Sequence, residues 1–313
     1  MYETKNEIEN LVHLYMDGAF NRRELVRRVK RHTGSLAAAL LALQALGVEE
    51  AAAQQCPADL RVAENAADLE TGMVDYRGPG GTVFGYLARP RDSGNPPRTR
   101  SAAIQSRLPA VLVIHENRGL NDHIKDVTRR LSRAGYVALG VDLISRLGGT
   151  HQFPDPVQAG QAYNRVGAAA YLEDMQASLT YLKNAFFVHP ERLGAVGFCA
   201  GGANCFQLAV NTQDLAAAVV FYGNSPNPLD QLDRLRAQFL GLYAELDRGI
   251  TSRVPDLVTG LLNRSKPFGI HIYQGARHAF NNDTGAAYNR AAATDAWART
   301  IAFFDRHLKK LEG

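Results

Sequence analysis

Residues 193–202 read LGAVGFCAGG, an apolar run that ends in a cysteine framed by glycines. The first part, Leu193–Phe198, is expected to be a strand that is buried on both faces, and a helical stretch follows it. Gly197 and Gly201 flank Cys199 in a G-x-C-x-G pattern, which is typical of a tight strand-to-helix turn. Glycine is required on both sides because this turn brings neighbouring backbones too close for a β-carbon. The pattern predicts an α/β fold with a reactive residue at the carboxyl end of a strand.

Short β-rich runs alternate with longer amphipathic stretches on both sides of this turn. The expected strands are Thr82–Ala88, Ala110–His115, Val137–Val141, Leu193–Phe198, Ala217–Tyr222, Phe239–Tyr243 and Ile270–Tyr273. The expected helices are Ile124–Ala134, Gln158–Asn184, Ala203–Val210, Val254–Asn263 and Ala286–His307. This alternation predicts a mostly parallel, doubly wound sheet with helices on both faces. Ligands should bind where the strands end, and residues 89–107, rich in proline, glycine and charge, should form a surface loop.

Cys199 is the candidate nucleophile. The helix that follows it points N–H groups at the thiol, which favours the thiolate and can stabilise an oxyanion. The alternative role for a free cysteine is a small buried hydrophobic residue. That is the interpretation for Cys205, which lies further along the helix without a glycine frame. The chain has three cysteines, of which Cys56 is the third. They are too few and too irregularly spaced for a disulfide framework or a zinc site.

A thiol that is mostly protonated at neutral pH needs a base. Among nine histidines the best candidate is His278, because it follows the last expected strand and so lies at the carboxyl edge of the sheet. An acid is expected after the preceding strand to fix the imidazole tautomer, and Asp247 stands there. The chain order Cys199, Asp247, His278 is the nucleophile–acid–base order of α/β-hydrolases.

With these residues the chain resembles the dienelactone hydrolases, or carboxymethylenebutenolidases, over roughly residues 70 to 310. The resemblance depends on the segment around Cys199, on Asp247, on residues 275–280 (GARHAF) and on residues 115–120 (HENRGL). It implies an α/β-hydrolase fold without metal or organic cofactor. The cysteine nucleophile is a hallmark of that family, since most α/β-hydrolases use serine.

The resemblance assigns further roles. Glu116 matches a family glutamate that helps to generate the thiolate when substrate enters, and the N–H groups of Asn117 and Ala200 would form the oxyanion hole. Dienelactone hydrolases also hold a substrate carboxylate with two arginines. The matching segments here, Phe280–Asp283 and Gln158–Tyr163, contain no arginine. Nearby arginines that could substitute are Arg146, Arg165 and Arg277.

The first 60 residues differ from the body, which is expected to be a single domain over residues 61–313. Residues 1–33 predict a polar helix, and residues 34–48 form an Ala/Leu run too short to span a bilayer. Arg22-Arg23, this apolar run and Ala51-Ala52-Ala53 resemble a degenerate twin-arginine export signal, which would place the protein in the periplasm. The alternative is a helical hairpin that packs on the body or on a second subunit of a cytoplasmic protein.

The composition and net charge limit the kinds of partner that the protein is expected to bind. A net charge of +4 and a pI near 9.0 are compatible with nucleic-acid binding, but no basic stripe or nucleic-acid motif is present outside the cluster from Arg22 to His32. We therefore expect no nucleic-acid partner, no stable membrane insertion and a small ester or lactone substrate. Two other functions are open: a carboxylesterase or thioesterase acting on a neutral substrate, and an inactive ligand-binding protein with the same fold.

Overall fold

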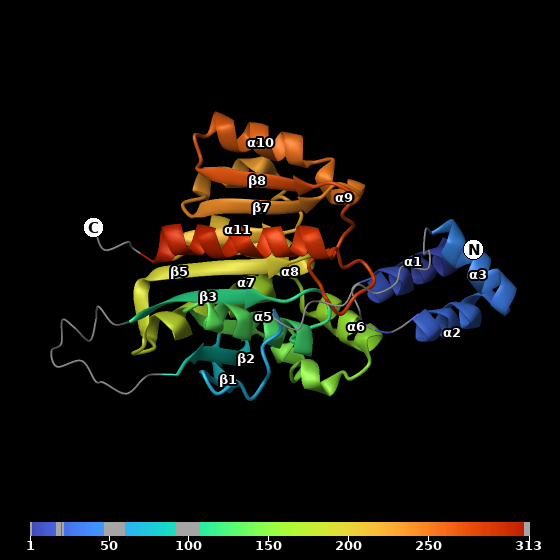
Figure 1. Ribbon diagram of the computed structural model, residues 1–313, viewed down its shortest axis with the longest axis horizontal. Helices are drawn as coiled ribbons and strands as arrows, with labels where there is room; N and C mark the ends of the chain where they lie inside the picture. The colour runs from blue at the N-terminus through green and yellow to red at the C-terminus, as the bar shows by residue number, and fades with distance from the viewer. Residues whose placement is uncertain (1, 17–19, 21, 47–59, 92–106, 310–313) are drawn as a thin grey trace.

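The computed structural model describes residues 2–16, 20, 22–46, 60–91 and 107–309. Its centre is an eight-stranded sheet in the order β1-β2-β4-β3-β5-β6-β7-β8 (Figure 1). The β1–β2 and β2–β4 pairs are antiparallel and the remaining pairs are parallel, so the predicted mostly parallel sheet is confirmed. The strands are β1 (Leu69–Gly78), β2 (Gly81–Pro90), β3 (Leu108–Ile114), β4 (Val137–Val141), β5 (Val188–Phe198), β6 (Ala217–Phe221), β7 (Gln238–Ala244) and β8 (Phe268–Tyr273).

Helices cover both faces of the sheet because its central strands are apolar on both sides. On β3, Leu112 and Ile114 face one core, whereas Val111 and Val113 face the other. The first core is completed by α6 (Pro156–Val166), α7 (Ala168–Asn184), α8 (Ala200–Asn211) and α10 (Val254–Asn263), and the second by α5 (Asp122–Arg133) and α11 (Arg290–Leu308). Alternate residues of one strand thus pack into two different cores. This explains why continuous Val/Ile/Leu runs predicted a sheet covered by helices on both faces.

The structure differs from the sequence predictions at several elements of the body. Strand β1 was not predicted, because it is an edge strand whose side chains are mostly half-buried or exposed and carry little apolar signal. The single helical stretch predicted over Gln158–Asn184 is broken at Gly167, whose φ of 89° ends α6 and begins α7. Helix α11 begins at Arg290 rather than at Ala286, since the Asn289 side chain accepts a hydrogen bond from Ala292 and caps it.

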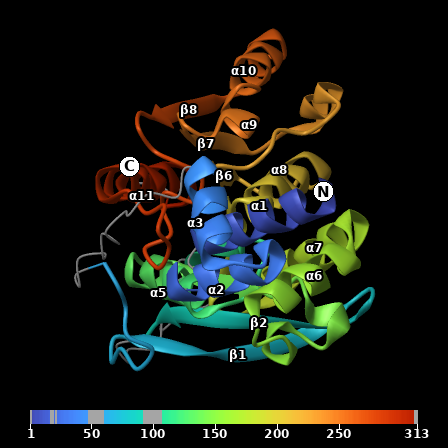
Figure 2. The same cartoon turned by 90° about the vertical axis from the view of Figure 1, so that its right-hand side faces the viewer.

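Three helices precede the sheet: α1 (Tyr2–Met16), α2 (Arg22–Thr33) and α3 (Leu36–Ala45). The single polar helix predicted over residues 1–33 is therefore two helices, and the apolar run after it is the third. They share a small core of their own and lie beyond the ends to which the parallel strands point (Figures 1 and 2). No helix in the described part of the chain is long and apolar enough to cross a membrane. Ala51–Ala53, and residues 92–106 of the predicted surface loop, lie outside the described residues.

Candidate active site

Cys199 stands between β5 and α8 in a backbone conformation that L-residues rarely adopt, with φ 56° and ψ −119°. Its N–H donates to the carbonyl of Phe221 on β6, which holds this strained turn in place. The close approach predicted for the flanking glycines is present: a β-carbon on Gly197 would lie 2.0 Å from the carbonyl oxygen of Gly201. The turn presents the half-buried thiol at the carboxyl edge of the sheet.

The structure brings Cys199, His278 and Asp247 together, although up to 79 residues separate them in the chain. His278, in the loop after β8, has its Nε2 3.0 Å from the Cys199 Sγ. Its Nδ1 lies 2.5 Å from Oδ2 of Asp247, which follows β7 and precedes the short helix α9 (Arg248–Thr251). The Asp247 carboxylate thus accepts a hydrogen bond from the imidazole on the side away from the thiol, which fixes the tautomer with Nε2 toward sulfur.

Electrostatics favour a proton on His278. Burial opposes the charged imidazolium, but a negative charge on Cys199 and the hydrogen bond to Asp247 outweigh it, and the pKa of His278 is raised well above its ordinary 6.5. Cys205 contrasts with this arrangement. Its thiol is fully buried on α8, and burial raises its pKa to about 12. Of these two thiols, only Cys199 stands next to a group that can accept its proton.

Glu116 follows β3 at the same edge and is only 1% exposed. Its Oε2 accepts a hydrogen bond of 3.1 Å from Nδ2 of Asn282, four residues beyond His278. His115, before it, is fully buried and has a structural contact, since its Nε2 accepts a hydrogen bond from the N–H of Leu143. The Glu116–Asn282 contact joins the β3 loop to the loop that carries His278.

The two segments with candidate oxyanion donors run side by side. Ala200 is the first residue of α8, and Asn117 lies three residues beyond β3. Gly201 packs so closely against the β3 loop that a β-carbon on it would be 2.2 Å from the carbonyl oxygen of His115. This close approach brings the N-terminus of α8 to the loop that carries Asn117.

Arg146, one of the three arginines that could replace the family arginines, is already engaged in other ion pairs. Its guanidinium forms ion pairs of 2.9 Å with Asp174 and 2.7 Å with Glu173, both on α7. Arg165, near the end of α6, and Arg277, in the loop after β8, are both exposed. The described residues contain no cluster of three or more His, Cys, Asp or Glu side chains that could hold a metal ion.

Sequence reasoning missed two contacts of the site. Asn282 gave no signal because it lay where an arginine was expected. Tyr222, the last residue of the expected strand Ala217–Tyr222, lies beyond the observed β6, with φ 38° and its ring centroid 5.1 Å from that of His278. Its position at a strand end was the available signal, since every other residue of the site also follows a strand.

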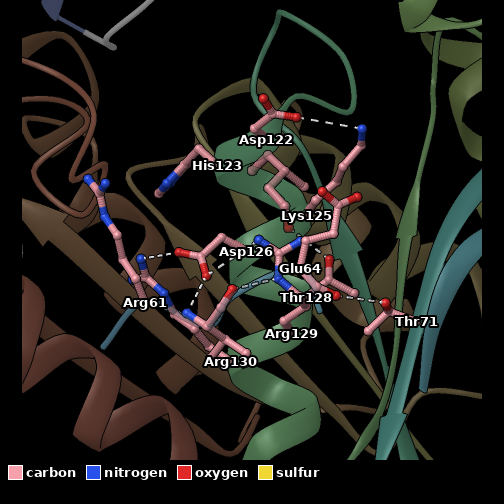
Figure 3. Close-up of polar contacts among 12 residues, drawn as sticks. Arg61, Glu64, Thr71, Asp122, His123, Lys125, Asp126, Thr128, Arg129 and Arg130 are labelled. Carbon is pink, nitrogen blue, oxygen red and sulfur yellow. Dashed lines mark hydrogen bonds and ion pairs between the residues drawn. The ribbon is translucent and has the colours of Figure 1, made fainter. Parts of the chain in front are cut away.

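A mostly buried ionic cluster lies at α5, where Figure 3 shows Arg61, Asp126 and Arg130. Asp283 accepts hydrogen bonds from Arg130 at 2.5 Å and from His123 at 3.1 Å, and it pairs with Arg61 at 3.3 Å. Arg130 also pairs with Asp126 on its own helix. The cluster joins the segment before β1 and helix α5 to the loop that carries His278.

Comparison with known proteins agrees with this architecture. Residues 99–308 match the dienelactone hydrolase family. A Saccharolobus solfataricus protein named as a carboxymethylenebutenolidase is 34% identical over 63% of this chain and 89% of its own. A Bradyrhizobium protein named as a 2-oxo-3-(5-oxofuran-2-ylidene)propanoate lactonase is 32% identical over 75% of this chain and 94% of its own. A solved Klebsiella pneumoniae structure named as a dienelactone hydrolase is 28% identical, with a TM-score of 0.67, and covers 76% of this chain and 99% of its own. With the family match spanning most of its length, the chain belongs to the dienelactone hydrolase family of α/β-hydrolases.

Proposed function

We propose that the protein hydrolyses a carboxylic ester or lactone with Cys199 as nucleophile, His278 as base and acid, and Asp247 as the residue that orients His278. The observation that carries the proposal is the position of the imidazole, whose two nitrogens lie 3.0 Å from the thiol sulfur and 2.5 Å from the carboxylate oxygen. These distances are within reach of direct proton transfer.

The reaction has two steps. In acylation the Cys199 thiolate attacks the carbonyl carbon, the N–H groups of Asn117 and Ala200 stabilise the oxyanion, and the carbon–oxygen bond breaks as His278 gives its proton to the leaving alcohol. In hydrolysis of the acyl-thioester, His278 takes a proton from water, the resulting hydroxide attacks the carbonyl, and the carbon–sulfur bond breaks. The acid leaves, and the thiolate and the protonated imidazole are restored.

Loss of the nucleophile tests the proposal. Cys199→Ala should lower kcat/KM for short p-nitrophenyl esters by at least about 10³-fold, because a triad residue acts as part of a unit. Cys205→Ala is the matched control and should retain activity, and iodoacetamide at neutral pH should label Cys199 before Cys205. Turnover by Cys199→Ala within about tenfold of the parent protein would refute the assignment.

Glu116 is proposed to promote formation of the thiolate. Single-turnover kinetics of the same esters separate acylation from hydrolysis of the acyl-enzyme. Glu116→Gln should slow acylation and affect the second step less, because that step depends on His278 and water. An unchanged acylation rate would leave Cys199, His278 and Asp247 as the whole catalytic set.

A neutral substrate is the second candidate. It is favoured because the matching segments contain no arginine and Arg146 is already paired with two carboxylates. A neutral ester and an ester of the same alcohol with a free carboxylate on its acyl group would separate the two substrate classes by their kcat/KM values.

A further inference from the structure

The helices α1–α3 are attached to the two segments that border the candidate active site. The carbonyl oxygen of Met16, at the end of α1, accepts a hydrogen bond of 3.2 Å from the N–H of Ala287, in the segment between His278 and α11. Met16 and Cys199 also pack against the same hydrophobic core. The end of α1 is therefore fixed beside the loop of the catalytic histidine.

The second attachment is ionic. Arg28 of α2 forms an ion pair of 2.7 Å with Asp155, the residue that caps the N-terminus of α6. This contact holds the pKa of Asp155 below its ordinary value. Val157 on α6 and Ala286 in the histidine loop pack against the core of the three helices. The helices are thus joined to the body on two sides, and we refer to α1, α2 and α3 together as the cap.

His13 is the cap residue that meets the catalytic base. Its ring centroid lies 6.4 Å from that of His278, with the two rings nearly perpendicular at 87°. His13 is exposed, and the side chains of His278 and Asp247 keep 20% and 13% of their surface accessible. With the cap in place, both side chains thus keep part of their surface accessible, and the His13 ring lies beside that of His278.

The position of His278 identifies the part of the substrate that would contact His13. The leaving oxygen must receive its proton from the imidazole, so the alcohol part of an ester lies next to His278 during acylation. Because His13 also lies next to His278, His13 and the alcohol of an ester would be neighbours during acylation. Once the alcohol of an ester has left, this neighbour of His13 is gone.

We propose that the cap forms the wall of the alcohol subsite and that His13 is a specificity-determining residue that limits the size of the leaving group. The proposal rests on the proposed ester hydrolysis. The cap lies outside residues 99–308, which match the family. The Klebsiella pneumoniae structure aligns over 99% of its own chain but only 76% of this one, so about a quarter of this protein has no counterpart there.

Two esters with the same acetyl group and different alcohols test the proposal: phenyl acetate and 2-naphthyl acetate. His13→Ala should raise the ratio of kcat/KM for naphthyl over phenyl by at least about fivefold, because a ring beside the leaving group is replaced by a methyl group. His13→Phe keeps a ring of similar size and should keep the parent ratio. The acetyl-enzyme hydrolysis rate, measured from burst kinetics, should be unchanged in both variants.

Lys30→Ala, at an exposed position on α2, is the control for nonspecific effects of changing the cap, and it should leave the ratio unchanged. Arg28→Ala removes the ion pair with Asp155 and should shift the ratio in the same direction as His13→Ala, by a smaller factor. An unchanged ratio in His13→Ala, or an equal change in Lys30→Ala, would overturn the proposal. Undiminished turnover of both esters by Cys199→Ala would instead refute the catalytic assignment itself.

Discussion

At the residue scale, the protonation of His278 reflects its two neighbours. Burial alone would lower the pKa of a histidine, yet that of His278 is raised, and an adjacent negative charge on Cys199 is the largest favourable contribution. A negative charge on Cys199 thus favours the protonated form of the imidazole beside it. In the acyl-enzyme of the proposed mechanism the sulfur is neutral, so the pKa of His278 should fall and allow it to act as a base toward water.

Cys199→Ala should reproduce that second state. Without the thiolate, the pKa of His278 should fall relative to the parent protein, which NMR titration of the imidazole resonances would measure. A raised pKa stabilises the fold fully below the ordinary value of 6.5 and loses this effect as the pH rises through the folded-state pKa. An unchanged His278 titration would mean that Asp247 alone keeps the proton in place.

At the element scale, the turn between β5 and α8 depends on the absence of a β-carbon. On Gly201 it would lie 2.2 Å from the carbonyl oxygen of His115 and 2.4 Å from that of Ile114, both backbone atoms that cannot rotate away. Gly201→Ala should therefore cost about 3 kcal/mol or more, or separate α8 from the β3 loop, with loss of activity. Thermal unfolding and ester turnover would measure both effects.

Gly249 in α9 provides the matched control, because a β-carbon there meets no atom within 4 Å and Gly249 is not among the glycines with positive φ. Gly249→Ala should retain activity and change stability by less than about 1 kcal/mol. Equal stability and activity of the two alanine variants would contradict the steric explanation of the glycine frame.

The elements that could be predicted from the sequence are those with a strong apolar period. Val137–Val141 was predicted with its observed bounds, and the expected strands ending at Cys199 and before Asp247 and His278 are all present. Strand β1 was missed because an edge strand buries little apolar surface. The break at Gly167 was missed because the amphipathic pattern continues across it.

At the scale of the whole molecule, no local pattern in the sequence indicates which distant segments come into contact. The position of His13 beside His278 depends on how the cap is oriented on the body, which no local pattern encodes. The sequence draws attention to Asp283 only as part of Phe280–Asp283, a segment in which the resemblance implies an arginine and none is present. In the folded protein it joins three parts of the chain, through Arg61 before the sheet and Arg130 on α5.

Asp283 should therefore stabilise the whole molecule. Burial favours its neutral form, but the hydrogen bond from His123 and the charge of Arg130 outweigh this effect and hold the pKa of Asp283 well below its ordinary 3.8. The resulting stabilisation is present above about pH 4 and is lost as the pH falls through the lower folded-state pKa. Asp283→Asn leaves Arg130 with one carboxylate fewer in a buried position and should cost about 3 kcal/mol at neutral pH.

The control for this variant is Asp68→Asn, because Asp68 pairs with Arg133 of the same helix at 3.0 Å but both side chains are about half exposed. An exposed pair is screened by water, so its loss should change stability much less. Urea unfolding at pH 7 and at pH 3.5 would measure both variants. Between pH 7 and pH 3.5 the parent protein should lose stability partly because Asp283 binds a proton more readily in the unfolded state. Asp283→Asn has no carboxyl at this position, so the variant should lose less stability over the same pH range. If the two variants unfold alike at pH 7, the buried cluster contributes no more than an exposed ion pair, and the histidine loop must be held by its other contacts, such as the hydrogen bond from Asn282 to Glu116.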